Sequence, residues 1–291
     1  LADCFFKKND DGSQTWYNPA DVTLERDEKG KITGAKHLEA GELEMGGSIK
    51  MSKSKNNGVD PQTAVDLYGA DTVRLFTMFA APPEQTLEWS DSGVEGAHRF
   101  LKRLWKTSHS HLAAGKVSSI PAELDKKQQE LRRKTHETIK KVSDDCGRRQ
   151  TFNTAIAATM ELLNDITRQA DRNTPESRAV EREALEACVR LLAPIVPHIS
   201  HELWHAFGHD CAVIDAEWPQ VDEAALVRSS ITLVVQVNGK LRAKLDVAAD
   251  TNADTIIAMA KTHEKVIPFL EGKEIKMCKV IPGKLVTFAV K

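Results

Sequence analysis

The chain has 291 residues, of which 41% are hydrophobic and 28% are charged, and its formal net charge at pH 7 is −2. This length predicts two or three domains, with enough apolar residues for hydrophobic cores. No stretch approaches the ~18 consecutive apolar residues of a transmembrane helix, so no membrane partner is expected.

The cysteines and the first residues indicate the setting of the protein. The five cysteines are scattered, odd in number and without a Cys-Xaa-Xaa-Cys pair, which favours a reducing, cytoplasmic location. No signal-peptide pattern opens the chain, which begins with the apolar Leu1 rather than with methionine. We therefore expect the chain to be a piece of a larger protein.

Residues 1–48 are predicted to form a small β-rich module. Turn signals such as Asn18-Pro19 and Gly46-Gly47 divide this region into short pieces. Between them, Thr15-Trp16-Tyr17 and Val22-Thr23-Leu24 have the β-branched and aromatic residues that are typical of strands.

The segment Lys50-Met51-Ser52-Lys53-Ser54 carries two ammonium groups and two hydroxyls within five residues. Such groups, together with backbone N–H donors, are suited to binding a polyphosphate. Asn56, Asn57 and Gly58 follow, and no apolar run anchors the segment, so we expect a loop that moves between open and closed states. A merely solvated basic loop is the alternative, which the pentapeptide by itself leaves open.

Helical patterns follow the loop as far as about residue 207. Asp60-Pro61 is a typical helix start and Gly69 a typical stop, a second helix begins near Asp71, and a third spans about 92–109. From residue 125 onward, apolar residues at helical spacing predict three long amphipathic helices with short connections. Such helices would form an antiparallel bundle.

The pattern changes to strands in residues 229–291. Residues 233–237 and 241–247 flank the hairpin turn Asn238-Gly239, a helix is expected over 252–263, and residues 275–281 and 285–290 would form a second strand pair. The last segment is therefore predicted to be a compact α/β domain.

This last segment is also basic. Residues 229–291 contain nine Lys and one Arg against three Asp and three Glu, a net charge of +4, so the remainder of the chain carries −6. A basic domain favours a polyanionic partner, although ordinary surface lysines are the alternative. No aromatic residues interleave with the cations, so we expect contacts to a nucleic-acid backbone rather than base stacking. The candidate contacts are Lys240, Arg242, Lys244, Lys276, Lys279 and Lys284.

A second motif points to a different chemistry. His201-Glu202-Leu203-Trp204-His205 matches HExxH, which on a helix places two imidazoles and a carboxylate together as in zinc hydrolases. Histidines on a polar helix face fit the same pattern, and no cleft for a peptide is indicated nearby. We therefore favour a structural role and predict no metal site.

Two charged pairs in the bundle have open alternatives. Arg148-Arg149 would be suited to a nucleic-acid phosphate, but arginines on a helix surface are equally often solvated or ion-paired. Asp144-Asp145 is expected to be a solvated helix face rather than a metal site.

Most of the chain resembles the C-terminal third of bacterial leucyl-tRNA synthetases, a family of class I aminoacyl-tRNA synthetases. The signature loop of that class is KMSKS, which residues 50–54 match. The resemblance to the leucyl family continues through 55–61 (KNNGVDP), 68–76 (YGADTVRLF), 87–89 (LEW), 93–97 (GVEGA), 148–156 (RRQTFNTAI), 236–240 (QVNGK) and 282–285 (PGKL).

The resemblance implies a multidomain α+β fold, mainly α. Residues 1–48 would be the small β-rich leucine-specific insertion, and 49–110 the loop with a helical connector. Residues 111–228 would be the antiparallel helix bundle of the anticodon-binding type, and 229–291 the compact C-terminal α/β domain that binds tRNA.

The resemblance also implies a reaction: ATP-dependent activation of leucine and its transfer to leucine tRNA, with ATP and Mg²⁺ as substrate. Residues 50–54 would bind ATP, Lys53 would stabilise the departing pyrophosphate and Lys50 would be the second cation. Ser52 and Ser54 would shape the loop or donate hydrogen bonds.

No HIGH-type motif, Rossmann core or editing domain is found in the chain, and all would lie upstream of Leu1. By itself the chain is therefore expected to be inactive and to need these domains as partners, alongside leucine tRNA. A stand-alone tRNA-binding module is the alternative.

Overall fold

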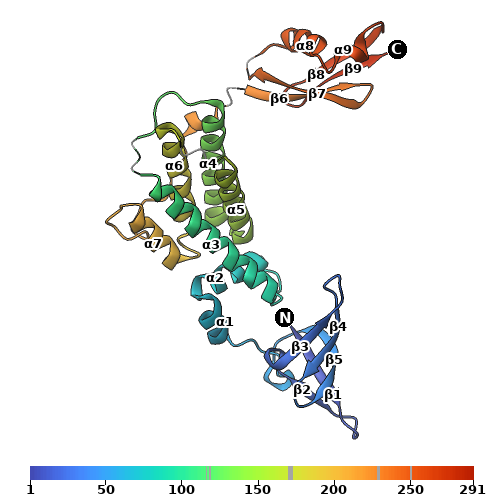
Figure 1. Ribbon diagram of the computed structural model, residues 1–291, viewed down its shortest axis with the longest axis vertical. Helices are drawn as coiled ribbons and strands as arrows, with labels where there is room; N and C mark the ends of the chain where they lie inside the picture. The colour runs from blue at the N-terminus through green and yellow to red at the C-terminus, as the bar shows by residue number, and fades with distance from the viewer. Residues whose placement is uncertain (116, 118, 170–172, 228–229, 250) are drawn as a thin grey trace. The chain divides into compact units, whose positions relative to one another are not determined.

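The computed structural model describes residues 1–115, 117, 119–169, 173–227, 230–249 and 251–291. The chain has an α+β fold and divides into two compact units, Leu1–Ala225 and Leu226–Lys291 (Figure 1). The predicted boundary at residues 228–229 lies outside the described residues. Within the described ranges, no helix is both long and apolar enough to cross a membrane.

The first unit opens with a five-stranded antiparallel sheet of order β2-β1-β5-β4-β3. Its strands are β1 (Ala2–Lys8), β2 (Gln14–Tyr17), β3 (Val22–Arg26), β4 (Ile32–His37) and β5 (Gly41–Ile49). Phe5, Ala35 and Leu43 form its small core. The two strand-like pieces predicted from the sequence are β2 and part of β3. The other three strands were not identified, because their alternation is broken by glycines and charged residues.

The helices of the first unit are α1 (Pro61–Tyr68), α2 (Ala70–Ala80), α3 (Asp91–Ala113), α4 (Lys126–Asp144), α5 (Phe152–Gln169), α6 (Pro175–Leu192) and α7 (Pro197–Ala206). The boundaries predicted for the first two are confirmed to within a residue or two, since Asp60 accepts hydrogen bonds as the N-cap of α1 and Gly69 ends it.

The bundle contains more helices than the sequence indicated. One continuous core draws buried residues from α2 to α7, including Leu104 of α3, Leu163 of α5, Leu185 of α6 and Leu203 of α7. α3 therefore belongs to the same core as α4, α5 and α6 (Figure 1). The predicted third bundle helix ends earlier than expected, because the chain turns at Pro194 and Pro197 restarts it as α7.

Helix α2 is fastened to the α6–α7 turn by two polar side chains. The Asp71 carboxylate, on a side chain that is 11% exposed, accepts hydrogen bonds from the backbone N–H of Ile199 (2.7 Å) and from His198 Nδ1 (2.8 Å), so it caps the first turn of α7. The Arg74 guanidinium donates to the carbonyl oxygens of Pro194 (3.0 Å) and Ile195 (2.8 Å). The second helix after the signature loop, α2, is thereby joined to the bundle.

The second unit is a four-stranded sheet of order β7-β6-β9-β8. Its elements are β6 (Ser230–Val237), β7 (Lys240–Ala248), α8 (Ala253–Thr262), α9 (Ile267–Leu270), β8 (Ile275–Ile281) and β9 (Leu285–Val290). Both predicted hairpins and the predicted helix are confirmed. The parallel pairing of β6 with β9, which joins the hairpins into one sheet, was not predicted.

The core of the second unit lies on one face of this sheet. Alternate residues of β6, β7 and β9, such as Val235, Leu245 and Phe288, pack with Ile256 and Ala260 of α8. The helices cover this face only (Figure 1). The opposite face carries the alternate set of side chains.

Candidate nucleotide and nucleic-acid interface

The signature loop exposes both of its predicted functional cations. Lys50 and Lys53 are exposed, and neither ammonium group has an ion-pair or hydrogen-bond partner among the described residues. A short 3-10 turn, η2 (Lys53–Lys55), carries Lys53, and the hydroxyls of Ser52 and Ser54 lie 3.2 Å apart. The loop thus presents two positive charges that no ion pair within the described ranges compensates, which favours binding of a polyphosphate.

The expectation that both asparagines loosen this loop is wrong for Asn57. Its side chain is fully buried, and its Oδ1 accepts a hydrogen bond from the backbone N–H of Ser52 (2.9 Å). Its Nδ2 donates to the carbonyl oxygens of Ala2 (3.3 Å) and Ile49 (3.5 Å), a cross-strand pair at the end of the β1–β5 ladder. Asparagine is frequent in turns, so composition favoured flexibility, and only the fold shows that this carboxamide is enclosed.

A contact from the β-rich module also holds the loop. Lys55 Nζ lies 3.7 Å from the ring centroid of Trp16 in β2, well within the range of a cation–π interaction. Phe6 in β1 packs against the same indole at 5.0 Å. No pattern in the sequence indicated this contact, because Trp16 and Lys55 are far apart in the chain.

The arginines predicted to contact nucleic acid lie where α4 ends. The turn η3 (Asp145–Arg149) has the π-helical pattern, and Gln150 after it adopts a left-handed conformation with φ of 55°. This wider turn, rather than a plain helix end, leads the chain into α5.

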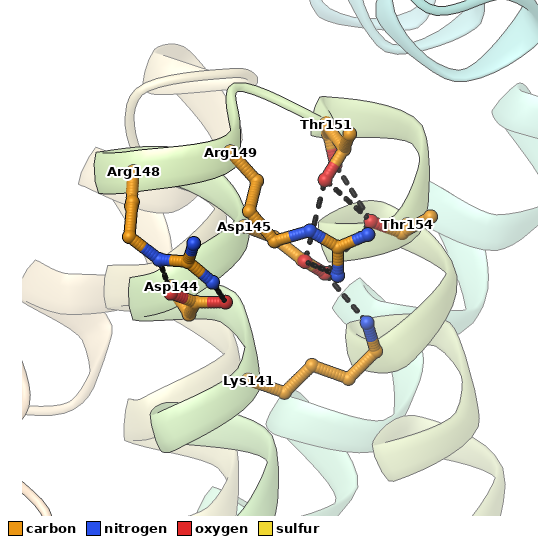
Figure 2. Close-up of polar contacts among 7 residues, drawn as sticks. All are labelled: Lys141, Asp144, Asp145, Arg148, Arg149, Thr151 and Thr154. Carbon is orange, nitrogen blue, oxygen red and sulfur yellow. Dashed lines mark hydrogen bonds and ion pairs between the residues drawn. The ribbon is translucent and has the colours of Figure 1, made fainter.

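Asp145 organises that turn (Figure 2). Its carboxylate is completely buried and accepts hydrogen bonds from Lys141 Nζ (2.6 Å), Arg149 Nη1 (3.0 Å), Thr151 Oγ1 (3.3 Å) and Thr154 Oγ1 (2.7 Å). Burial raises the pKa of the carboxyl, but the hydrogen bonds from Lys141 and Thr154 and the positive charge of Lys141 outweigh it and hold the pKa below its usual value.

The prediction that Asp144-Asp145 is a solvated face is therefore wrong for Asp145 and fits only Asp144. The Asp144 carboxylate is 41% exposed and accepts two hydrogen bonds from Arg148, at 2.6 and 2.9 Å (Figure 2). Both arginines are thus ion-paired, yet the Arg148 side chain is 75% exposed and that of Arg149 48%. Each guanidinium keeps N–H groups that face solvent.

The basic residues of the second unit are spread over several surfaces. Lys244 and Lys279 lie on the uncovered sheet face, on its two outer strands. Two rows cross this face: Lys244–Val234–Leu285–Ile281 and Leu241–Gln236–Thr287–Lys279. Three strand spacings therefore separate the two lysines, roughly 14 Å measured across the strands.

The other four cations lie elsewhere. Lys240 is at the hairpin end and Lys284 in the β8–β9 turn, both exposed. Lys276 is paired with Glu274 at 3.0 Å. A β-bulge opposite Val235 and Gln236 turns Arg242 out of the alternation, and its guanidinium lies 3.8 Å from the ring centroid of Phe269 in α9. Arg242 thereby packs α9 onto β7.

The HExxH residues lie on the surface of α7. The two variable positions, Leu203 and Trp204, are buried in the bundle core, which leaves His201, Glu202 and His205 on the outer side. The Nε2 atoms of the two histidines are 3.1 Å apart. No third His, Cys, Asp or Glu joins them into a metal-binding group within the described ranges.

We expect zinc titration of the chain to show no stoichiometric high-affinity site, because a zinc site needs at least three protein ligands. Calorimetry with wild-type protein and with His201→Asn measures this. Binding of one zinc ion that the substitution abolishes would contradict the prediction and revive the hydrolase alternative.

Two protein families match parts of the chain. Residues 44–90, which span the signature loop, α1 and α2, match "tRNA synthetases class I (I, L, M and V)". Residues 128–257, which span the bundle from α4 and continue into the second unit, match "Anticodon-binding domain of tRNA ligase".

Curated relatives match the chain almost end to end. The leucine–tRNA ligases of Chromohalobacter salexigens and Marinobacter nauticus are 62% and 58% identical, each over 98% of this chain. A solved ternary complex, titled Agrobacterium radiobacter K84 agnB2 LeuRS-tRNA-LeuAMS, is similar at a TM-score of 0.68 and 29% identity, over 83% of this chain and 31% of that one. The chain spans 34% and 33% of the two relatives' lengths. The resemblance found in the sequence is thus confirmed: the chain belongs to the leucyl-tRNA synthetase family.

Proposed function

We propose that this chain is the C-terminal part of an enzyme that activates leucine with ATP and transfers it to leucine tRNA. The observation that carries this proposal is the KMSKS loop in a chain so similar to leucine–tRNA ligases, with Lys50 and Lys53 exposed and without an ion pair in the part of the chain that the structure describes. The upstream domains of the same protein would supply the leucine site, the rest of the ATP site and editing.

The loop would act on the first step of the reaction. When the leucine carboxylate attacks the α-phosphate of Mg²⁺-bound ATP, pyrophosphate leaves and negative charge grows on it. An ammonium group aimed at that charge lowers the barrier, and among the described residues no counterion has to be displaced from the loop's cations first. Lys53 fills this role and Lys50 is the second cation. Met51, Ser52 and Ser54 complete the ATP-binding loop.

The bundle and the second unit would bind the body of the tRNA. Arg148 and Arg149 offer their outward N–H groups to phosphates, and their aspartate partners hold each guanidinium in one orientation. In the second unit, Lys244 and Lys279 face solvent on the uncovered sheet, and Lys240 and Lys284 extend the positive charge to neighbouring turns. Arg242 and Lys276 contribute less, because each already has an intramolecular partner.

The test is tRNA binding by the full-length protein over a salt series, with and without residues 229–291. Deletion should weaken binding of leucine tRNA and leave leucine activation nearly intact. The affinity of the intact protein should fall steeply with salt, because phosphate contacts release counterions. Loss of activation with unchanged tRNA affinity would contradict this assignment of the second unit.

Single substitutions sharpen the test. Lys244→Ala and Lys279→Ala should each lower the salt slope by about 1. Lys261→Ala is the matched control, because that exposed lysine lies on α8, at the covered face of the sheet. Equal effects of all three would indicate a general effect of net charge, and full binding by the 291-residue chain alone would favour the stand-alone module.

A further inference from the structure

The segment that carries Lys53 is closed at its base by one buried side chain. Ser52 and Asn57 stand on either side of η2, and the Asn57 carboxamide accepts the Ser52 backbone N–H at 2.9 Å. The same carboxamide donates to the carbonyl oxygens of Ala2 and Ile49. One side chain thereby connects the turn to the end of the β1–β5 ladder by hydrogen bonds.

A second contact, made by Lys55, holds one side of this turn against the β-rich module. Lys55, two residues after Lys53, lies over the Trp16 indole, and Phe6 supports that indole from β1. The turn is thus held both at its base and at one side. The module thereby restrains the backbone from which the Lys53 side chain extends.

We propose that Asn57 and Trp16 are positioning residues for the activation step. Neither touches the reacting atoms. Asn57 sets the base of the turn and Trp16 sets its tilt, so that the ammonium group of Lys53 meets the leaving pyrophosphate. Resting on the proposed function, this inference extends the activation machinery into the β-rich module, from which no catalytic residue is expected.

Limited trypsin digestion of the full-length protein measures the base contact directly. Asn57→Ala should raise the rate of cleavage after Lys50 and Lys53 about tenfold, because the lost hydrogen bonds raise the population of the open turn. Asn56→Gly is the matched control: this neighbour is exposed, has a φ of 46° that glycine adopts freely, and makes no side-chain hydrogen bond within the described chain. Its cleavage rate should equal that of the wild type.

ATP–pyrophosphate exchange measures the functional consequence. Asn57→Ala and Trp16→Leu should each lower kcat about 10- to 100-fold, as misplacement of a catalytic group by about 1 Å does. KM for leucine should stay within twofold, since leucine binds elsewhere. Trp16→Phe keeps an aromatic face for Lys55 and should retain most of the activity. If Trp16 only stabilised the module, Trp16→Phe and Trp16→Leu should have the same activity.

The outcomes separate this inference from the proposed function. If Lys53→Ala slows exchange while Asn57→Ala and Trp16→Leu do not, the inference is overturned and the function stands. If Lys53→Ala itself leaves exchange unchanged, the proposed role of the loop fails. Should Asn57→Ala not fold, the Trp16 pair decides alone, because Trp16 is only half-buried. Equal kcat values for Trp16→Leu and Trp16→Phe would overturn the inference.

Discussion

Replacing Lys53 with alanine in the full-length protein should slow ATP–pyrophosphate exchange by about 10²- to 10³-fold, the usual effect of losing one preorganised group that stabilises a developing negative charge. The ammonium group is exposed and free of ion pairs among the described residues, so its whole charge is available to the leaving pyrophosphate. Leucine affinity should barely change.

Lys29→Ala is the control for this experiment. Lys29 is also an exposed lysine without an ion pair in the described chain, and it lies in the turn between β3 and β4 of the same module. Exchange should proceed at the wild-type rate in that variant. A Lys53→Ala enzyme with unaltered exchange would remove Lys53 from the mechanism.

Replacing Asp145 with asparagine should destabilise the helix bundle by about 3 kcal/mol, the low end of the range for removing one partner of a buried charge pair. The low end applies because Lys141 and Arg149 are each 48% exposed and regain water when the carboxylate is lost. Thr151 and Thr154 donate to different oxygens of the carboxylate, and asparagine keeps only one acceptor oxygen, so one of these two hydrogen bonds is also lost. Urea unfolding followed by circular dichroism measures the loss as a lower midpoint.

Asp144→Asn is a matched control, because it makes the same substitution at the adjacent aspartate and removes that residue's ion pair with Arg148. The Asp144–Arg148 pair is exposed, and exposed ion pairs contribute little. Its unfolding midpoint should stay close to that of the wild type. Equal losses in the two variants would contradict the view that Asp145 alone organises the turn.

The effect of Asp145 depends on pH in a definite direction. Its pKa is lower in the folded protein than in the unfolded chain, where it is about 3.9. The stabilisation is therefore fully present above about pH 4 and is lost as the pH falls through the folded-state pKa. The difference in unfolding free energy between the wild type and Asp145→Asn should become smaller in that acidic range. A difference that stays constant with pH would contradict the ion-pair account.

Patterns among neighbouring residues determined where several helices and turns of this protein lie and to which family it belongs. The helix from Asp60-Pro61 to Gly69 and the hairpin around Asn238-Gly239 were predictable, because caps and turns depend on residues adjacent in the chain. The signature loop and the family were recognisable for the same reason: their identity lies in contiguous residues.

Tertiary structure decided the partners of the polar side chains. Asn57 and Asp145 were expected to face solvent as a flexible turn residue and a helix surface residue, and both are buried acceptors instead. Such burial depends on which segments enclose a residue, and these lie up to 55 positions away for Asn57. The spacing of residues along the chain does not show which distant segments will enclose a side chain.

The same distinction holds for the cations. The sequence alone determined which residues of the second unit are basic. It also predicted that the candidate contacts lie on or next to two strand pairs. The parallel pairing of β6 with β9 placed Lys244 and Lys279 at opposite edges of one uncovered face, and a bulge turned Arg242 onto Phe269. Charge is a property of each residue, whereas a binding surface results from strand order and register, which long-range hydrogen bonds and core packing decide.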